Sequence, residues 1–561
     1  MTEVRDLSSQ KAVTGCFDSD HQYGLFASKA YQAGDTILSE SPLIILKHTS
    51  PNEIRSQFEN SCFTTTGKKS SDNDEDEKDG NIINDLTLPT SFTDGMTAHH
   101  TKKIKALTLA AASYALHRPP NLSDEKEKIF QLFHPSTKSQ GDGDSEDEKN
   151  ALKMARQALK ICKQIAAPET SLNRLVHQET KGADELVNLL LIYSCNAFEG
   201  GRIYHQLSRA NHSCNPNAIV CEISSGDDSD VSLLKAACDI AEGEEINISY
   251  LGSYLYSGYP TRQRVLRDSK YFICQCSRCS STSHNDLAAI IPCPACHPRS
   301  GRYLDEDVMF DDGDEGDLTV SYAIPKNGMT AEERSIYCEG CKETTSFNPN
   351  EQSMRKKKKA SCVSYMNMAE EKVYDRLEGN DNLNGNSSTG DKGLDVEREA
   401  NEQFYEMATS VCGAKHWTTH FMNLSLIEES LANFHSTLIS MGQNPDQDAE
   451  TMEELLTGIA EAADGIERAW VYASGLNLKT DPAQWLFDYT IGLARTLVGL
   501  GDKKSQKYAA QWIEKVDDYA CKFESDGMQK VVSSLKDAWK RHTSSEGEES
   551  DKKRQKVALV N

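Results

Sequence analysis

The spacing of hydrophobic residues changes several times along the chain, and each change marks a new block. Residues 12–47 contain the short apolar runs "YGLFAS" and "TILSESPLIIL" on either side of a Gly34-Asp35 turn, which predicts strands. Between 97 and 195, apolar residues recur every three or four positions, which predicts helices. Three helices are expected there, in "TAHHTKKIKALTLAAASYALH", "SEDEKNALKMARQALKICKQI" and "GADELVNLLLIYSC".

Strand patterns return between 218 and 255, and a second helical block begins near 400. The segments "AIVCEIS", "VSLLKAACDI" and "INISYL" predict strands that would have to pair with the first strand block across the helical insert. Four later segments, which begin with "HFMNLSL", "AETMEEL", "QWLFDYT" and "SQKYAAQ", are amphipathic helices joined by short links. They resemble stacked hairpins of the tetratricopeptide type without a strict period of about 34 residues, and an ordinary helical bundle is the alternative.

Five polar runs separate or follow these blocks. They are rich in Asp, Gly, Ser and Asn, and they bury too little apolar surface to offset the entropy of ordering a chain, so we expect disorder. The runs are "KKSSDNDEDEKDGN" from 68, "KSQGDGDSEDEKN" from 138, "DEDVMFDDGDEGD" from 305, "EGNDNLNGNSSTGDKG" from 378 and "SSEGEESDKKRQK" near the end.

The composition narrows the classes of partner. Acidic residues outnumber basic residues by 86 to 61, which gives a formal net charge of -25. This charge repels phosphate backbones, so we expect no direct nucleic-acid binding, and a basic partner such as a lysine-rich protein tail is easier to accommodate. The length of 561 residues exceeds what one core usually spans and indicates roughly three or four structural units.

The first residues, "MTEVRDLSSQKAVTG", lack the apolar core of a secretion signal. No run reaches the roughly 18 to 20 apolar residues that span a bilayer, so we expect a soluble intracellular protein with no membrane association. Reduced thiols are the rule in the cytosol and nucleus. The closely spaced members of the 17 cysteines are therefore better explained as metal ligands than as disulfides.

Seven cysteines lie in the short motifs "CQCSRC", "CPAC" and "CEGC". Structural zinc takes four tetrahedral ligands, and two close pairs of thiolates from separate turns are the usual source. Cys293, Cys296, Cys338 and Cys341 meet this description. The roughly forty residues between the pairs include an acidic run, which can loop out because the entropy of loop closure grows slowly with length.

Cys274, Cys276 and Cys279 then lack a fourth ligand. The candidates for it are Cys214, Cys221, Cys238 and His284. We favour Cys214, because it lies next to a proline turn rather than inside a strand, where a thiol usually packs as a small hydrophobe. Two zinc ions per chain are expected on this count, and the alternative is a set of free buried thiols.

The bend "YHQLSRANHSCNPNAIV", residues 204–220, concentrates asparagine amides around a histidine and a cysteine. An asparagine side chain offers both a donor and an acceptor, so Asn211 could recognise a polar ligand, and the backbone at His212 could pair with an adenine edge. A catalytic imidazole and a purely structural knot are equally compatible with these residues alone.

Three blocks, "RANHSCNPNA", "GEEINISY" and "YFICQCSRC", resemble the SET-domain protein lysine methyltransferases in order and spacing. The segments "CNAF" at 195–198 and "YGLFASKAYQAGDTILSESPLI" at 23–44 extend the resemblance. With its helical insert, second cysteine cluster and helical C-terminal region, the chain is most similar to the SET-and-MYND branch. That branch has a MYND zinc module soon after "SPLIILK", but here Cys62 is the only cysteine between Cys16 and Cys162, so we predict no MYND module.

The resemblance implies binding of S-adenosylmethionine beneath a knot of crossing segments, with the target lysine entering by a narrow channel from the opposite face. Tyr250 would lie at the channel mouth and orient the amine; packing of this tyrosine at a sheet end is the alternative. Cys214, Cys274, Cys276 and Cys279 match the ligands of the post-SET zinc. The residues implied in cofactor binding are Tyr23, Gly24, Asn196, Asn211, His212 and Phe272. Gln22 replaces the first glycine of the family's Gly-x-Gly, which places a side chain where the backbone would approach the cofactor.

These observations predict an α+β fold in which a SET domain with a helical insert precedes two zinc segments and an all-α domain. The predicted boundaries are 12–60 and 191–255 for the two SET parts, 61–190 for the insert, 256–281 for the post-SET zinc segment, 282–362 for the second zinc module, 400–545 for the C-terminal helices and 546–561 for a disordered tail.

The predicted function is S-adenosylmethionine-dependent methylation of a lysine on a histone or another protein. The alternatives are a SET-fold scaffold that acts through its C-terminal helices, and a zinc-ribbon nucleic-acid protein, which the acidic charge disfavours. A peptide partner of the C-terminal helices is also expected. The basic runs "RKKKK" at 355–359 and "KKRQK" at 552–556 are short enough to be nuclear import signals or solvated loop lysines, so the nucleus and the cytoplasm are both predicted locations.

Overall fold

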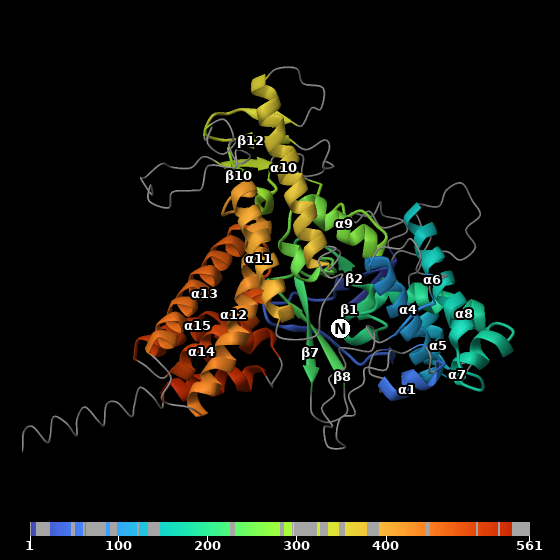
Figure 1. Cartoon of the computed structure of the whole chain (residues 1–561). Coiled ribbons are helices and arrows are strands. Elements are labelled where there is room, and N and C mark those ends of the chain that lie inside the picture. The colour runs from blue at the N-terminus through green and yellow to red at the C-terminus, as the bar shows by residue number, and fades with distance from the viewer. Residues whose placement is uncertain are drawn as a thin grey trace, which may run out of the picture.

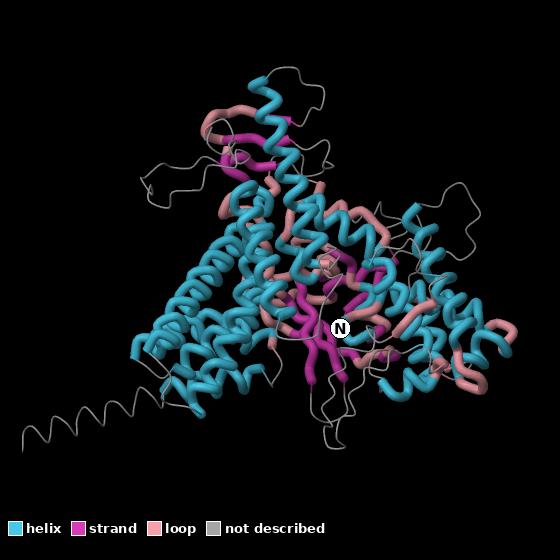
Figure 2. The backbone as a smooth tube through the Cα atoms, in the orientation of Figure 1, coloured by secondary structure: helices cyan, strands magenta, loops and turns pink. Residues whose placement is uncertain are grey.

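The computed structural model describes most of the chain, and its central strands lie between two groups of helices, while β10 (Ile291–Pro292) and β12 (Ser335–Cys338) lie apart from them beside α10 (Met354–Leu377) (Figures 1 and 2). The described residues are 2–6, 23–46, 51–59, 62, 86–89, 92, 98–119, 123–132, 146–224, 230–280, 285–293, 296, 322–325, 335–346, 354–378, 392–443, 449–500, 503–524 and 528–540. The polar runs that begin at 68, at 305 and near the end lie outside these residues.

The central strands bring the two predicted strand blocks together. A three-stranded antiparallel sheet has the order β3-β8-β7, with β3 at Thr36–Glu40, β8 at Asp230–Ala236 and β7 at Ala218–Ser224. Three strand pairs accompany it: β1 (Thr2–Asp6) with β2 (Tyr23–Ala27), β4 (Ile44–Ile45) with β5 (Arg202–Ile203), and β6 (Asn211–His212) with β9 (Asn247–Ile248). The pairings of β3 with β8 and of β4 with β5 join segments on the two sides of the insert, as the sequence predicts.

The insert contains the three predicted helices, α4 (Ala98–His117), α6 (Glu146–Ile165) and α8 (Gly182–Asn196). A short helix, α1 (Pro51–Ser56), precedes them, and α5 (Asp124–Phe130), α7 (Ser171–Asn173) and a π-helical turn over Arg174–Gln178 lie between them. Residues 146–150 were predicted both as the start of the second helix and as the end of a disordered run; the helix prediction is confirmed, because α6 begins at Glu146, and acidic residues in a first turn interact favourably with the positive end of the helix dipole.

Glu185 ties α8 to its neighbours in the insert. Its carboxylate accepts hydrogen bonds from Tyr114 Oη at 2.7 Å, Arg118 Nη2 at 2.7 Å and Lys126 Nζ at 2.8 Å. Burial alone would raise the pKa of Glu185, but these hydrogen bonds lower it overall, so the group is charged at neutral pH. The network therefore holds α8 against α4 and α5, and α8 leads directly into the site.

After β9, a 3-10 turn over Gly252–Tyr256 leads to α9 (Tyr259–Lys270). Tyr271 follows α9 in the left-handed conformation, with φ 63°, and turns the chain back toward the strands. A 3-10 turn at Leu287–Ala289 precedes an antiparallel sheet of order β10-β11-β12-β13. Its strands are β10 (Ile291–Pro292), β11 (Tyr322–Pro325), β12 (Ser335–Cys338) and β13 (Thr344–Ser346).

The C-terminal region includes the four predicted helices, but its helices begin earlier than the sequence patterns indicated. These four are α12 (Trp417–Gln443), α13 (Ala449–Gly475), α14 (Ala483–Leu500) and α15 (Lys503–Phe523), and 528–540 is helical as well. Two further helices, α10 (Met354–Leu377) and α11 (Lys392–Cys412), precede them. The run 355–359 therefore lies in a helix and not in a loop. Predicted disorder at 392–393 is also wrong, because α11 starts there.

The C-terminal helices share a hydrophobic core with the segment that follows the central strands. One cluster of buried side chains contains Leu251 and Leu266 together with Leu486 and Ile513. Trp485 stacks on Tyr256 with ring centroids 4.5 Å apart and planes 15° apart. The C-terminal region is therefore continuous with the strand domain, so loss of either packing partner affects both.

None of the helices in the described ranges combines the length and apolar character that crossing a bilayer requires.

Truncating a leucine in this shared core should destabilise the C-terminal helices far more than the same change at their surface. Leu486 on α14 is fully buried, whereas Leu456 on α13 is 44% exposed. We expect Leu486→Ala to lower the free energy of unfolding by about 2–5 kcal/mol, and Leu456→Ala to lower it by less than about 1 kcal/mol. Chemical denaturation followed by circular dichroism measures both, and equal losses would contradict a core at Leu486.

Candidate functional site

The bend at 204–220 crosses a second chain segment, 244–250. Strands β6 and β9 run parallel, with Asn211 opposite Asn247, and Ser213 N donates to Ile248 O at 3.0 Å. The Asn217 side chain ties the segments again, because Asn247 N donates to its Oδ1 at 2.8 Å and its Nδ2 donates to Glu245 O at 2.9 Å. The asparagine amides thus replace the strand ladder where the two segments cross.

The Asn211 side chain is held by an acidic partner. Its Nδ2 donates to Glu245 Oε1 at 2.8 Å. Burial raises the pKa of the Glu245 carboxyl, and the bond from Asn211 offsets part of that rise. Asn211 therefore has a fixed amide orientation before any ligand is present.

His212 is buried and neutral. Burial lowers its pKa to about 3, because the charged ring would lose its hydration. Its Nδ1 accepts a hydrogen bond from Tyr250 N at 3.0 Å, so the ring proton lies on Nε2, which is 3.3 Å from Cys214 Sγ. Both ring nitrogens are engaged, which argues against a catalytic imidazole and makes His212 a link between Tyr250 and the cysteines.

Tyr250, His212 and Phe272 form a wall of aromatic rings from three chain segments. The ring centroids are 5.3 Å apart for His212 and Tyr250, 6.0 Å for His212 and Phe272, and 6.4 Å for Tyr250 and Phe272. The Tyr250 hydroxyl donates to Ala210 O at 2.6 Å, which fixes the ring relative to the bend. These three predicted residues are therefore brought together with Asn211.

The remaining predicted cofactor residues lie on α8 and β2. Asn196 ends α8, and its Nδ2 donates to Ile192 O of the same helix at 2.9 Å. Gly24 is buried in β2, and the next residue, Leu25, accepts a hydrogen bond through its O from Ile246 N at 2.8 Å. The backbone of Tyr23 also lies in β2, whereas its side chain and the whole of Gln22 lie outside what the structure describes.

Lys270, the last residue of α9, is a site residue that the sequence analysis missed. Its Nζ lies 3.0 Å from Cys195 O and 3.5 Å from Ser194 O, at the C-terminal end of α8. The same atom lies 5.5 Å from the centroid of the Tyr250 ring. A lysine at the end of a polar helix usually faces solvent, so no local signal distinguished it.

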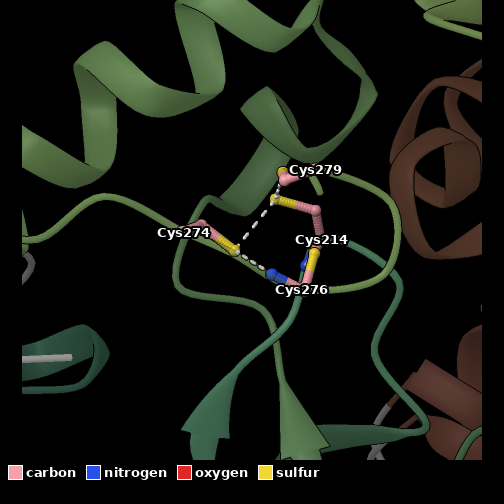
Figure 3. Close-up of side chains that lie close together, drawn as sticks. All are labelled: Cys214, Cys274, Cys276 and Cys279. Atoms are coloured by element: carbon pink, nitrogen blue, oxygen red, sulfur yellow. Dashed lines mark hydrogen bonds between the residues drawn. The ribbon is translucent and has the colours of Figure 1, made fainter. Parts of the chain in front are cut away.

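Cys214 approaches Cys274, Cys276 and Cys279, as Figure 3 shows. The four sulfur atoms lie within 4.8 Å of one another and are buried. Cys214 Sγ is 3.4 Å from Cys279 Sγ and 3.9 Å from Cys274 Sγ. A tetrahedral zinc with Zn–S bonds of about 2.3 Å requires sulfurs about 3.8 Å apart, so this arrangement fits the ion.

Two arginines flank this first cysteine cluster. Arg278 Nη1 donates to Cys214 O and to Leu255 O, both at 2.9 Å. Arg262 is fully buried, and its Nη1 lies 3.7 Å from Asp286 Oδ1. Four thiolates around a divalent cation would leave two net negative charges, which nearby guanidinium groups stabilise.

Cys293, Cys296, Cys338 and Cys341 form the second cluster, at one end of the β10–β13 sheet, and their sulfurs also lie within 4.8 Å of one another. The Cys293–Cys341 and Cys296–Cys338 sulfur pairs are each 3.7 Å apart, which again matches the edge of a zinc tetrahedron.

Other cysteines do not join these clusters. Within the described residues, Cys221, Cys238 and Cys62 belong to no group that could hold a metal, and His284 lies outside those residues. Burial raises the pKa of the Cys221 thiol to about 12, as expected for a thiol packed like a hydrophobe.

Comparison with known proteins agrees with this geometry. Residues 22–251 match the SET domain family. The chain is 33% identical over 125 residues to N-lysine methyltransferase SMYD2 of Sus scrofa, covering 20% of this chain and 27% of that protein. It is 26% identical over 278 residues to histone-lysine N-methyltransferase ASHR1 of Arabidopsis thaliana, covering 46% and 52%. It is 31% identical over 98 residues to histone-lysine N-methyltransferase SET5 of Saccharomyces cerevisiae, covering 18% of each chain.

The matches therefore span from under a fifth to about half of these relatives' lengths. The matched SET family region contains both strand blocks, the helical insert, the crossing of β6 with β9, and Tyr250. Residues 22–251 are a SET domain, and the chain is similar to lysine methyltransferases of the SMYD type.

Proposed function

We propose that the protein is an S-adenosylmethionine-dependent protein lysine N-methyltransferase. The observation that carries the proposal is the assembly of Asn211, His212, Tyr250 and Phe272 from three segments at the crossing of β6 and β9. The SET-domain match and the relatives named as lysine methyltransferases support it. They also disfavour a scaffold without turnover, since each of these relatives bears the name of an enzyme.

In this proposal, Asn211, the His212 backbone and Phe272 bind the cofactor, with Tyr23, Gly24 and Asn196 beside it. S-adenosylmethionine supplies a methyl group on a positively charged sulfur. The chain itself has to align the lysine amine and exclude water, since this displacement needs an unprotonated lone pair but no strong acid or base. Tyr250 orients the amine, and its hydroxyl is preset by the hydrogen bond to Ala210 O.

The two cysteine clusters are proposed to bind one zinc ion each as structural sites. Cys214 lies on the bend and its three partners lie just after Phe272, so a metal there would clamp the Phe272 segment onto the site. The second cluster lies in the β10–β13 sheet, outside the aromatic wall, and its metal would stabilise that sheet and its packing against α10 and α11.

The remaining assignments extend this proposal. The partner is a protein with an accessible lysine, such as a histone tail, whose basic charge complements the acidic chain. The C-terminal helices form a repeat-like domain of the tetratricopeptide type that takes a peptide partner. The predicted domain boundaries and a location in the nucleus or cytoplasm are part of the same proposal.

Metal analysis tests the zinc assignment. Purified protein should contain about two zinc ions per chain, and Cys276→Ser and Cys338→Ser should each reduce the content to about one. Cys276→Ser should also weaken binding of S-adenosylhomocysteine at least tenfold, whereas Cys338→Ser should leave it within about twofold. Mass spectrometry of the metal and calorimetry measure these quantities. A metal-free protein that still binds the ligand would refute the assignment.

Methyl transfer to a pool of histones and lysine-rich peptides tests the activity. Tyr250→Phe should lower kcat at least about tenfold and leave the Kd of S-adenosylhomocysteine unchanged, because it removes only a hydroxyl that orients the amine. Asn211→Ala should raise that Kd by about tenfold or more.

Tyr254→Phe is the matched control. Its hydroxyl donates to Glu378 Oε1 at 2.8 Å and its ring packs against Tyr374 and Phe421 rather than against the aromatic wall, so activity should stay within about twofold of wild type. Tight ligand binding with no transfer to any lysine in the pool would speak against an enzyme.

A further inference from the structure

The Lys270 amine lies between the end of α8, which carries Asn196, and the aromatic wall formed by His212, Tyr250 and Phe272. Its Nζ lies 3.0 Å from Cys195 O, next to Asn196, and 5.5 Å from the centre of the Tyr250 ring. Phe272 follows two residues later and faces the same tyrosine. The lysine thus makes the two kinds of contact that suit an incoming amine, namely backbone carbonyl acceptors and an aromatic face.

The charge of Lys270 has no acidic counterpart in the part of the chain that the structure describes. Among the described residues, no Asp or Glu forms an ion pair with Nζ, whose hydrogen-bond acceptors are Ser194 O and Cys195 O, and the nearby Lys103 adds a second positive charge. Burial lowers the pKa of Lys270, while the nearby Cys195 opposes that effect. A half-buried ammonium group without a carboxylate is sensitive to any further charge placed beside it.

We propose that Lys270 is a specificity-determining residue that makes the space beside Tyr250 selective against a second ammonium group. This inference rests on the proposed function, in which Tyr250 receives the target lysine. A protonated lysine is repelled by the Lys270 ammonium, whereas the neutral amine is not. The residue therefore selects the form of the target that has a free lone pair for methyl transfer.

One competing role is open to the same ammonium: it could bind the α-carboxylate of the cofactor. The two roles differ in a measurable way. If Lys270 binds the carboxylate, it increases the affinity of every ligand that has the cofactor's amino-acid end by the same factor. A charge filter discriminates only between ligands that differ at the position of the transferred methyl group.

Sinefungin and S-adenosylhomocysteine separate these roles. They share the adenosine and the amino-acid end, but sinefungin has a protonated amine where the donor has its methyl group, and S-adenosylhomocysteine has a neutral thioether. Calorimetry gives the ratio of their Kd values for the full-length protein and for Lys270→Met, which keeps the length of the side chain and removes the charge.

We expect Lys270→Met to shift this ratio in favour of sinefungin by about tenfold. This is the size expected for two charges about 6 Å apart at an effective dielectric constant of about 40. Lys515→Met is the control, because the Lys515 amine also lies over an aromatic ring, that of Trp512 at 4.7 Å, but belongs to α15 in the C-terminal helices and not to the site. Its ratio should equal that of wild type.

An unchanged ratio in Lys270→Met overturns the proposal, and an equal loss of affinity for both ligands assigns Lys270 to the carboxylate instead. Failure of wild type to bind either ligand overturns the proposed function. In that case, the burial of Lys270 can still be tested by measuring how fast its amine reacts in reductive methylation, followed by peptide mass spectrometry. Its amine should react at least tenfold more slowly than that of exposed Lys153 on α6, and equal rates would overturn the burial on which the inference depends.

Discussion

The site depends on the crossing of two short parallel strands, β6 and β9, that are far apart in the sequence. Strands of two residues supply few ladder hydrogen bonds, so side chains provide the rest of the connection. Asn217 and Asn211 bond the segment around Glu245, and His212 accepts from Tyr250 N. Removing one amide would leave buried polar groups unpaired, which costs more than the bond itself contributes. The concentration of amides at this bend therefore has a structural cause before it has a chemical one.

The first cysteine cluster extends this crossing to a third segment. His212 Nε2 lies near Cys214 Sγ, and the partner cysteines follow Phe272, so the aromatic wall and the cysteines are parts of one buried unit. The C-terminal helices reinforce the same unit, because Lys479 N donates to Asn215 Oδ1 at 2.7 Å and Trp485 stacks on Tyr256. A change in the C-terminal helices can therefore reach the bend through direct contacts.

Much of the fold was predictable from hydrophobic spacing, and the failures have physical causes. Helix α10 was not predicted, because the basic run at 355–359 was interpreted as an import signal or as loop lysines. Met366, Ala369 and Val373 nevertheless recur at helical spacing and are fully buried. Residues 146–150 were assigned both to a predicted helix and to the disordered run before it, and the helix is correct, because the acidic residues 146–148 begin α6, where negative charge is favourable. Composition averages over a segment, whereas a helix boundary depends on individual residues.

The sequence by itself determined the pairing of strand blocks across the insert, the four later helices and the grouping of closely spaced cysteines, because each is encoded in local spacing. The choice of Cys214 among several candidates rested on one proline turn, and the tertiary structure brings its sulfur to the others. Only the tertiary structure placed Lys270 beside Tyr250, since the end of α8, the end of α9 and the bend meet through long-range packing. Local sequence patterns cannot predict the position of Lys270, because the free energy of a buried charge depends on neighbours that are distant in the chain.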